Sequence, residues 1–231
     1  LTAKSLKVDF LVHYGHSCLV PMNMESQLKI LYVFVDIKID HLHFVETLKL
    51  NFKPDTKLGL VSTVQFVSTL HSVATELRAE NYTVKVPQFR PLSPGEILGC
   101  TAPVIEDTDV IVYLGDGRFH LEAAMIANPR LRAYKYDPYS KRFSQELYKH
   151  KVMLDTRRKF IDVARSAKTF GVIMGTLGRQ GSRKVVDDIC NRLRQKNRKV
   201  VVILLSEIFP TKLELFEDID AFVQIACPRL S

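Results

Sequence analysis

Short runs of consecutive apolar residues recur along this chain and are typical of parallel strands covered on both faces. The expected strands are residues 7–20, 28–37, 58–65, 84–86, 110–114, 131–136, 170–174, 199–205 and 221–225. Segments with helical periodicity lie between many of these runs. The expected helices are residues 40–50, 66–80, 121–127, 144–168 and 183–196. This alternation predicts an α/β fold in which mostly parallel sheets are flanked by helices.

The long helix expected at 144–168 has an apolar face and a basic face. The apolar positions are Leu147, Met153, Leu154, Phe160, Ile161 and Ala164. A helix of this kind packs its apolar face on a core and leaves its basic face in solvent.

Two short patterns recur. The first pattern is an Asp, a Val three residues later and a Gly or Ala three residues after that. It starts at Asp9, Asp109 and Asp220. Leu-Arg-x-x-Asn ends the helices that finish near Asn81 and Asn197. Recurrence of this kind predicts three related α/β units, although ordinary similarity among α/β sequences is the alternative. The expected domains are a remnant at 1–26, a second domain at 27–143 and a C-terminally incomplete third domain at 144–231.

The composition is that of a soluble globular protein, with 46% hydrophobic and 25% charged residues among 231. No apolar run approaches the ~20 residues of a membrane helix. The net charge of +8 includes many basic residues at 141–198. They form either a solvated helix face or a surface that attracts an acidic or phosphorylated partner. We expect no direct nucleic-acid contact, because no arginine-rich tract or aromatic ladder supports base recognition.

The four cysteines are scattered, with no CxxC pair. Without a signal peptide, this usage indicates a reducing cytoplasmic setting rather than a disulfide framework. Cys190 and Cys18 have apolar neighbours that indicate burial. Cys100 and Cys227 lie in loops at strand ends, where soft metals can be bound, but their spacing alone leaves this open. The chain starts at Leu1 without a Met and stops directly after a strand, so we expect a fragment lacking both termini.

Polar residues follow several of the expected strands. In open α/β sheets, ligands bind at the carboxyl ends of the strands, so these residues are candidates for substrate binding. They are Gln65, Arg118, His120, Arg179 and Gln180. His13 and His16 also follow a strand and are either site residues or structural hydrogen-bonding groups. The glycine-rich loop at 175–182 could hold an anion at a helix N-terminus, but it lacks the P-loop and GxGxxG patterns, and a tight turn is the alternative.

Longer motifs give a specific resemblance to the diphthamide-biosynthesis family, and they cover essentially the whole chain. They are DFLVHYGHSCLVPM (9–22), YVFVDI (32–37), LVSTVQFVSTL (60–70), PLSPGEILGCTAP (91–103), YLGDGRFHLEAAMIANP (113–129), YKYDPYSK (134–141), GTLGRQGS (175–182), LLSEIFPTKL (204–213) and QIACPRLS (224–231). The resemblance implies three small α/β domains in a pseudo-threefold arrangement around a central 4Fe-4S cluster, with one cysteine ligand from each domain.

For the site, the resemblance implies that Cys100 and Cys227 are cluster ligands and that the third cysteine lies upstream of Leu1. Cys18 lies in a shared motif but matches no ligand. The implied reaction is the first step of diphthamide synthesis. It moves the 3-amino-3-carboxypropyl group of S-adenosylmethionine to a histidine of translation elongation factor 2 by a radical mechanism. The implied partners are a related second subunit, in a heterodimer, and a small electron-donor protein.

Three readings of function are therefore open. The first is a transferase subunit that is inactive as this fragment alone. The second is a non-catalytic structural subunit of the same complex. The third is a phosphate-binding α/β module, which rests only on residues 175–182.

Overall fold

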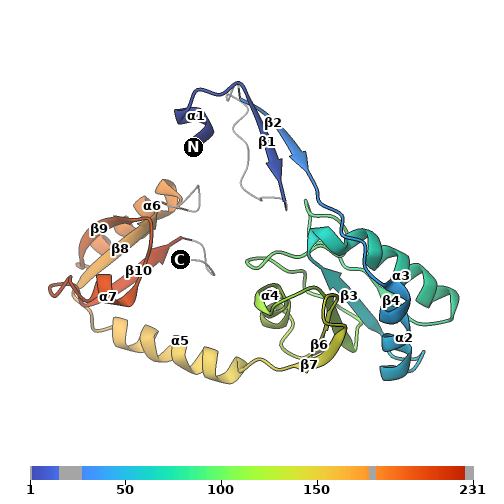
Figure 1. The fold of residues 1–231 in the computed structure, drawn as a ribbon. Coiled ribbons are helices and arrows are strands. Elements are labelled where there is room, and N and C mark those ends of the chain that lie inside the picture. Colours follow the sequence, from blue (N-terminus) through green and yellow to red (C-terminus); the bar gives the residue numbers. More distant parts are fainter. Residues whose placement is uncertain (1, 16–27, 177–180, 227–231) are drawn as a thin grey trace. The chain divides into compact units, whose positions relative to one another are not determined.

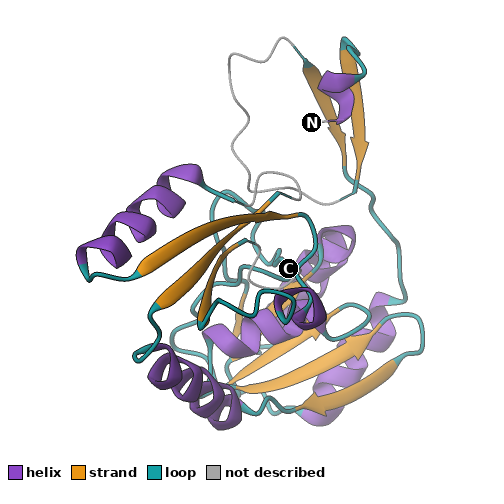
Figure 2. Ribbon diagram, turned by 90° about the vertical axis from the view of Figure 1, so that its left-hand side faces the viewer, coloured by secondary structure: helices purple, strands orange, loops and turns teal. Residues whose placement is uncertain are grey.

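The computed structural model describes residues 2–15, 28–176 and 181–226 (Figure 1). The chain divides into two compact units, a first unit at Thr2–Tyr148 and a second unit that begins at Lys149. Both contain mostly parallel sheets with flanking helices (Figure 2), which confirms the mixed α/β fold class. Each unit is described by itself.

A two-stranded parallel sheet lies near the start of the first unit, after the short helix α1 (Thr2–Ser5). It consists of β1 (Phe10–Tyr14) and β2 (Lys29–Val33). Both strands are shorter than the expected runs at 7–20 and 28–37, because their pairing ends with Tyr14 opposite Val33. Residues 16–27, which include His16 and Cys18, lie outside the described residues. The exposed His13 makes an edge contact with Tyr32, with ring centroids 5.2 Å apart.

The larger sheet of the first unit has five strands in the order β4-β3-β5-β6-β7. Its first four strands are parallel and β7 is antiparallel. The strands are β3 (Leu58–Ser62), β4 (Val84–Lys85), β5 (Val110–Leu114), β6 (Arg132–Asp137) and β7 (Arg142–Glu146). The helices are α2 (His41–Asn51), α3 (Val67–Ala79) and α4 (Phe119–Ala127), and the 3-10 turn η1 (Val64–Phe66) follows β3.

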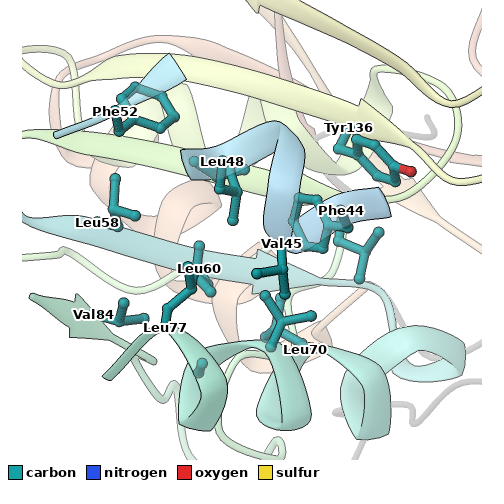
Figure 3. Packing of buried hydrophobic residues seen from close by; sticks show 14 of the residues in the cluster. Phe44, Val45, Leu48, Phe52, Leu58, Leu60, Leu70, Leu77, Val84 and Tyr136 are labelled. Carbon is teal, nitrogen blue, oxygen red and sulfur yellow. The ribbon is translucent and has the colours of Figure 1, made fainter. Parts of the chain in front are cut away.

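Helices α2 and α3 cover one face of this sheet and α4 covers the other. Phe44 and Leu48 of α2 are buried in one cluster with Leu60 of β3 and Leu70 of α3 (Figure 3). On the opposite face, α4 packs on alternate positions of the same strands, including Tyr113 of β5. The sheet is therefore covered on both faces, and its carboxyl ends are held rigidly.

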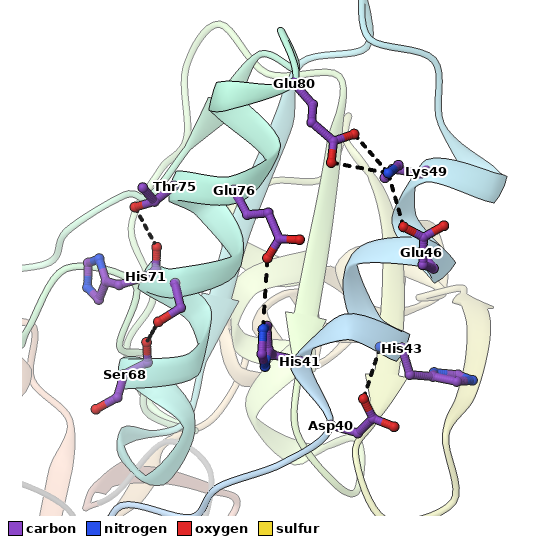
Figure 4. A network of polar contacts seen from close by, with 11 residues as sticks. Asp40, His41, His43, Glu46, Lys49, Ser68, His71, Thr75, Glu76 and Glu80 are labelled. Atoms are coloured by element: carbon purple, nitrogen blue, oxygen red, sulfur yellow. Dashed lines mark hydrogen bonds and ion pairs between the residues drawn. The ribbon is translucent and has the colours of Figure 1, made fainter.

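Polar contacts connect the outer surfaces of α2 and α3 (Figure 4). Lys49 lies 3.0 Å from Glu46 and 2.8 Å from Glu80, which belongs to the end of α3. Asp40 caps α2 by accepting a hydrogen bond from the backbone N–H of His43 at 3.1 Å. Exposed ion pairs of this kind contribute little to stability, so the apolar cluster beneath them decides how the two helices pack.

The second unit has a three-stranded parallel sheet in the order β10-β8-β9. Its strands are β8 (Thr169–Gly175), β9 (Lys199–Leu205) and β10 (Ala221–Ile225), and its helices are α5 (His150–Ala164), α6 (Arg183–Gln195) and α7 (Pro210–Leu213). Cys190 of α6 is buried against Val172 of β8 at 3% exposure, which confirms its expected place in a core. No helix among residues 2–15, 28–176 and 181–226 is long and apolar enough to cross a membrane.

The single long helix expected at 144–168 is wrong. Ser144 to Glu146 belong to β7, which pairs with β6 in an antiparallel hairpin, and the helix starts only at His150. Pairing with β6 satisfies the backbone groups of this segment, and local periodicity does not reveal that partner. No side chain of α5 is buried, and Phe160 is 67% exposed.

Shared details support the relation between two of the expected repeats. The order β4-β3-β5 in the first unit corresponds to β9-β8-β10 in the second. Asp109 accepts a hydrogen bond from the backbone N–H of Lys57 at 2.8 Å, and Asp220 accepts from Lys168 and Thr169 at 2.8 Å each. Both helix-ending asparagines have a positive φ, 65° at Asn81 and 56° at Asn197. These shared positions explain why the same residue types recur in the sequence.

We expect Asp220→Asn to remove part of the pH dependence of stability. Backbone hydrogen bonds from Thr169 and Lys168 hold the pKa of Asp220 below its ordinary value. A depressed carboxyl pKa stabilises the fold above the unfolded-state pKa, near 3.9, and that contribution is lost as the pH falls through the folded-state pKa. In urea unfolding of the full-length protein, the variant should be less stable than the parent at pH 7, and the difference should shrink in acid.

Asp218→Asn is the matched control, because Asp218 makes no hydrogen bond or ion pair in the described part of the chain. A stability difference for Asp220→Asn that stays constant down to pH 2 would contradict this role of the charge.

Candidate functional site

Cys100 lies at the tip of a tight turn that is attached to the carboxyl end of β3. The backbone of Ser62 donates to the carbonyl of Gly95 at 2.8 Å and accepts from Ile97 at 2.9 Å. Leu98 and Thr101 then exchange two backbone hydrogen bonds of 3.0 and 3.2 Å, which leaves Gly99 and Cys100 between them. Cys100 is exposed while the turn beneath it is buried. We call residues 98–101 the Cys100 turn.

The carboxyl end of β5 forms the second side of the site. Gly117 has φ +61°, a conformation that favours glycine. A Cβ at Gly115 would lie 2.5 Å from the hydroxyl of Tyr113, so only glycine fits against that ring. The Tyr113 hydroxyl donates to the carbonyl of Asp116 at 3.3 Å. Burial, with the charge of Asp116, raises the pKa of Tyr113, so the phenol stays protonated and holds the loop.

The Cys100 turn and the loop after β5 pack directly on each other. A Cβ on Gly99 would fall 1.7 Å from the ring of Phe119, so the backbone of the turn lies against that ring. The neighbouring His120 has its ring stacked near that of Tyr113, with centroids 6.5 Å apart and planes at 17°. Two segments that the sequence singled out separately, the cysteine loop and the tip after β5, therefore form one site.

Gln65 is half-buried in η1, just past the end of β3. Its backbone carbonyl accepts a hydrogen bond from Ile37 at 2.8 Å. Its side-chain amide makes no hydrogen bond within the described ranges, which leaves the amide available for a ligand. Gln65 and His120 thus follow β3 and β5, which are neighbours in the sheet, and their role in substrate binding stays a prediction.

Arg118 is engaged in protein contacts. Its guanidinium donates to Glu122 at 2.9 Å, to Glu146 at 2.6 Å and to the carbonyl of Leu147 at 2.6 Å. The predicted role of Arg118 in substrate binding stays a prediction, and this geometry favours a structural role.

Three buried polar groups at this edge were not singled out from the sequence as site residues. Ser62 Oγ and Glu96 Oε1 are buried and have no hydrogen-bond partner among the described residues, and the buried Thr63 Oγ1 lies beside the hydroxyl of Tyr113. The other carboxylate oxygen of Glu96 accepts from the backbone of Ser93 at 3.1 Å. Buried polar atoms normally have a partner, so their gathering next to the Cys100 turn makes this edge a candidate for ligand binding. The sequence feature that could have revealed them is the presence of polar residues at the end of an apolar strand.

The remaining predicted site residues lie outside the described residues. They are Arg179, Gln180 and Cys227. Among the described residues no group of three or more His, Cys, Asp or Glu side chains could hold a metal ion. Cys100 fits the part of a thiolate ligand, because an exposed sulfur on a rigid turn can be presented to a cluster without rearrangement of the fold.

Comparison with known proteins gives a family and close relatives. The family model for diphthamide synthesis proteins matches residues 1–231. The chain is 58% identical over 232 residues to 2-(3-amino-3-carboxypropyl)histidine synthase subunit 1 of Homo sapiens, covering 100% of the chain and 53% of that protein. It is 53% identical over 238 residues to the subunit 1 protein of Schizosaccharomyces pombe, covering 100% and 54%.

Among solved structures, the fold is similar to the crystal structure of Dph2 from Pyrococcus horikoshii with a 4Fe-4S cluster. The TM-score is 0.74 and the identity 28%, covering 99% of this chain and 67% of that one. A second crystal structure of the same Pyrococcus horikoshii protein matches with a TM-score of 0.74 and 27% identity, covering 99% and 66%. The chain therefore spans about half the length of the curated relatives that it matches.

Proposed function

Because this chain belongs to the diphthamide synthesis protein family, we propose that its full-length protein is the iron–sulfur subunit of the transferase that starts diphthamide synthesis. The proposed reaction moves the 3-amino-3-carboxypropyl group of S-adenosylmethionine to a histidine of translation elongation factor 2. The observation that carries the proposal is the exposed Cys100, fixed on a turn where β3 and β5 end.

In this proposal a 4Fe-4S cluster is held by Cys100, by Cys227 and by a third cysteine upstream of Leu1. The second and third domains, expected at 27–143 and 144–231, lie around it, with the boundary moved to Tyr148 and Lys149 because β7 belongs to the first unit. Residues 1–26 are the remnant of the first domain. The similarity to a cluster-containing relative supports this arrangement. When bound, the cluster would supply the electron for cleaving a carbon–sulfur bond of S-adenosylmethionine.

The residues of this chain bind and orient the substrate. The amide of Gln65 can donate to a carboxylate and accept from an ammonium group. His120, held beside the Tyr113 ring, can donate from an imidazole N–H. Arg179 and Gln180, which precede α6 in the sequence, complete the proposed binding of the amino-acid end of the substrate.

The proposed partners are a related second subunit, the elongation factor that is modified and a small electron-donor protein. The proposed setting is the cytoplasm. The subunit naming of the relatives supports assembly into a complex.

The test uses the full-length protein together with its second subunit. The complex is loaded with iron and sulfide under anaerobic conditions and given carboxyl-labelled S-adenosylmethionine, elongation factor 2 and a reductant. The proposal expects label on the elongation factor, lost when its target histidine is replaced. Full iron loading with no transfer of label would contradict the catalytic role. Label transfer by a complex in which this subunit holds no iron would assign it the structural role instead.

We expect these 231 residues alone to form little stable cluster, because two of the three proposed cysteine ligands are present. Anaerobic reconstitution of the chain, followed by measurement of iron and of visible absorbance, checks this. The full-length protein treated in parallel should bind close to four irons. A stoichiometric cluster in the shorter chain that responds to S-adenosylmethionine would contradict the three-cysteine assignment.

A further inference from the structure

Arg118 joins the site to the place where the first unit ends. It directly precedes Phe119 and His120 at the start of α4. Its side chain reaches Glu146, the last residue of β7, and the carbonyl of Leu147, both at 2.6 Å. The first unit ends at Tyr148 and the second begins at Lys149. One side chain therefore connects the loop after β5 to the exit of the chain.

The contacts of Arg118 are of the strong kind. A planar guanidinium that donates to two carboxylates and a carbonyl is held in one orientation. The Glu146 side chain is 15% exposed and that of Arg118 43%, so solvent partly screens this ion pair. The second carboxylate oxygen of Glu146 accepts from the hydroxyl of Ser144 at 2.9 Å, which fixes the acceptor as well.

A second contact holds the same exit. Tyr148 packs against the buried cluster beneath α4, which includes Tyr113 of the site. Helix α5 then begins at His150. Three consecutive residues, 146 to 148, are thus fixed to the part of the first unit that carries the Cys100 turn.

We propose that Arg118 is a positioning residue that ties the loop after β5 to residues 146–147 of the first unit, and so keeps Phe119 packed against the Cys100 turn. If the proposed function is correct, this contact holds the Cys100 sulfur in the position in which it binds the cluster. A turn that is fixed before the cluster binds loses less conformational entropy on binding. We call the contacts of Arg118 with Glu146 and Leu147 the clamp. The clamp rests on these contacts alone, whereas its effect on iron binding rests on the proposed function.

Hydrogen exchange of the full-length, iron-free protein tests the clamp. Arg118→Gln should raise the exchange rate of backbone amides at 146–150 by about tenfold, the effect of losing a hydrogen-bonded charge. Glu146→Gln should raise it less, because the contacts of Arg118 to Glu122 and Leu147 remain. Arg118→Lys should not restore the parent rate, because an ammonium cannot match the fork geometry. Arg132→Gln is the control, because it removes an exposed arginine of the same sheet that forms no ion pair with the described residues.

Iron retention of the full-length protein tests the consequence. Arg118→Gln and Glu146→Gln should lose iron several-fold faster than the parent while their melting temperatures stay within a few degrees, and Arg132→Gln should match the parent. The inference is overturned if exchange at 146–150 is unchanged, or if exchange rises and iron retention does not fall. If Arg118→Gln fails to fold, Glu146→Gln decides on the same two measurements. A parent protein that never binds iron would refute the proposed function, whereas normal iron retention in both variants would refute only the positioning role.

Discussion

Cys100→Ser in the full-length protein should abolish stable iron binding and leave the fold intact. Loss of a residue that only supports a metal ligand typically lowers metal affinity by 10- to 100-fold, so the loss of a thiolate ligand should cost at least about tenfold. The thiol is exposed, so its replacement opens no cavity and should leave the melting temperature of the iron-free protein unchanged. Iron content and visible absorbance after anaerobic reconstitution measure the first effect, and thermal unfolding measures the second.

Cys190→Ala is the matched control for this experiment. Its thiol is packed in the core of the second unit at 3% exposure. The replacement should lower stability by roughly 1 kcal/mol and leave the iron content unchanged. The opposite pattern, with iron lost in Cys190→Ala and kept in Cys100→Ser, would remove Cys100 from the ligand set.

Gly99→Val should displace the Cys100 turn, because the added side chain has no room beside Phe119. Even a single Cβ would come within 1.7 Å of the ring, and overpacking of this kind typically costs 1–3 kcal/mol. If overpacking destabilises the iron-binding position of the turn by this amount, iron affinity should drop by roughly 5- to 150-fold. Iron titration of the full-length variant, monitored by absorbance, measures the drop.

The double variant Gly99→Val with Phe119→Ala tests the cause. Removal of the ring makes room for the valine, so the double variant should bind iron better than Gly99→Val alone. Two losses that simply add would mean that Gly99 acts through its backbone rather than through contact with this ring.

Local patterns in the sequence predicted most of the elements of the fold. The apolar runs at 58–65 and 110–114 became central strands because both faces of the sheet are covered. Local periodicity predicts a helix at 144–146, because it does not show the pairing with β6 that makes this segment a strand. The apolar residues that follow it continue a helical pattern and hide the boundary.

The sequence predicts parts of the candidate site, and the details of the site depend on contacts between distant residues. The resemblance of the motifs pointed to Cys100, and the position of His120 after a strand is visible in the sequence. That Gly99 must be glycine follows from Phe119, and that Arg118 is engaged follows from Glu146, 28 residues away. A charge at the end of a strand is compatible with a ligand or with an ion pair, and only the fold distinguishes them.

Treatment of the iron-free full-length protein with a short thiol-to-thiol cross-linker, followed by peptide mapping, tests the central claim most directly. If the sulfurs of residues 100 and 227 serve one cluster, peptides containing them should be joined, and the joined product should disappear when the protein is first loaded with iron and sulfide. Recovery of both cysteines modified singly, with no joined peptide and no protection by iron, would contradict the account.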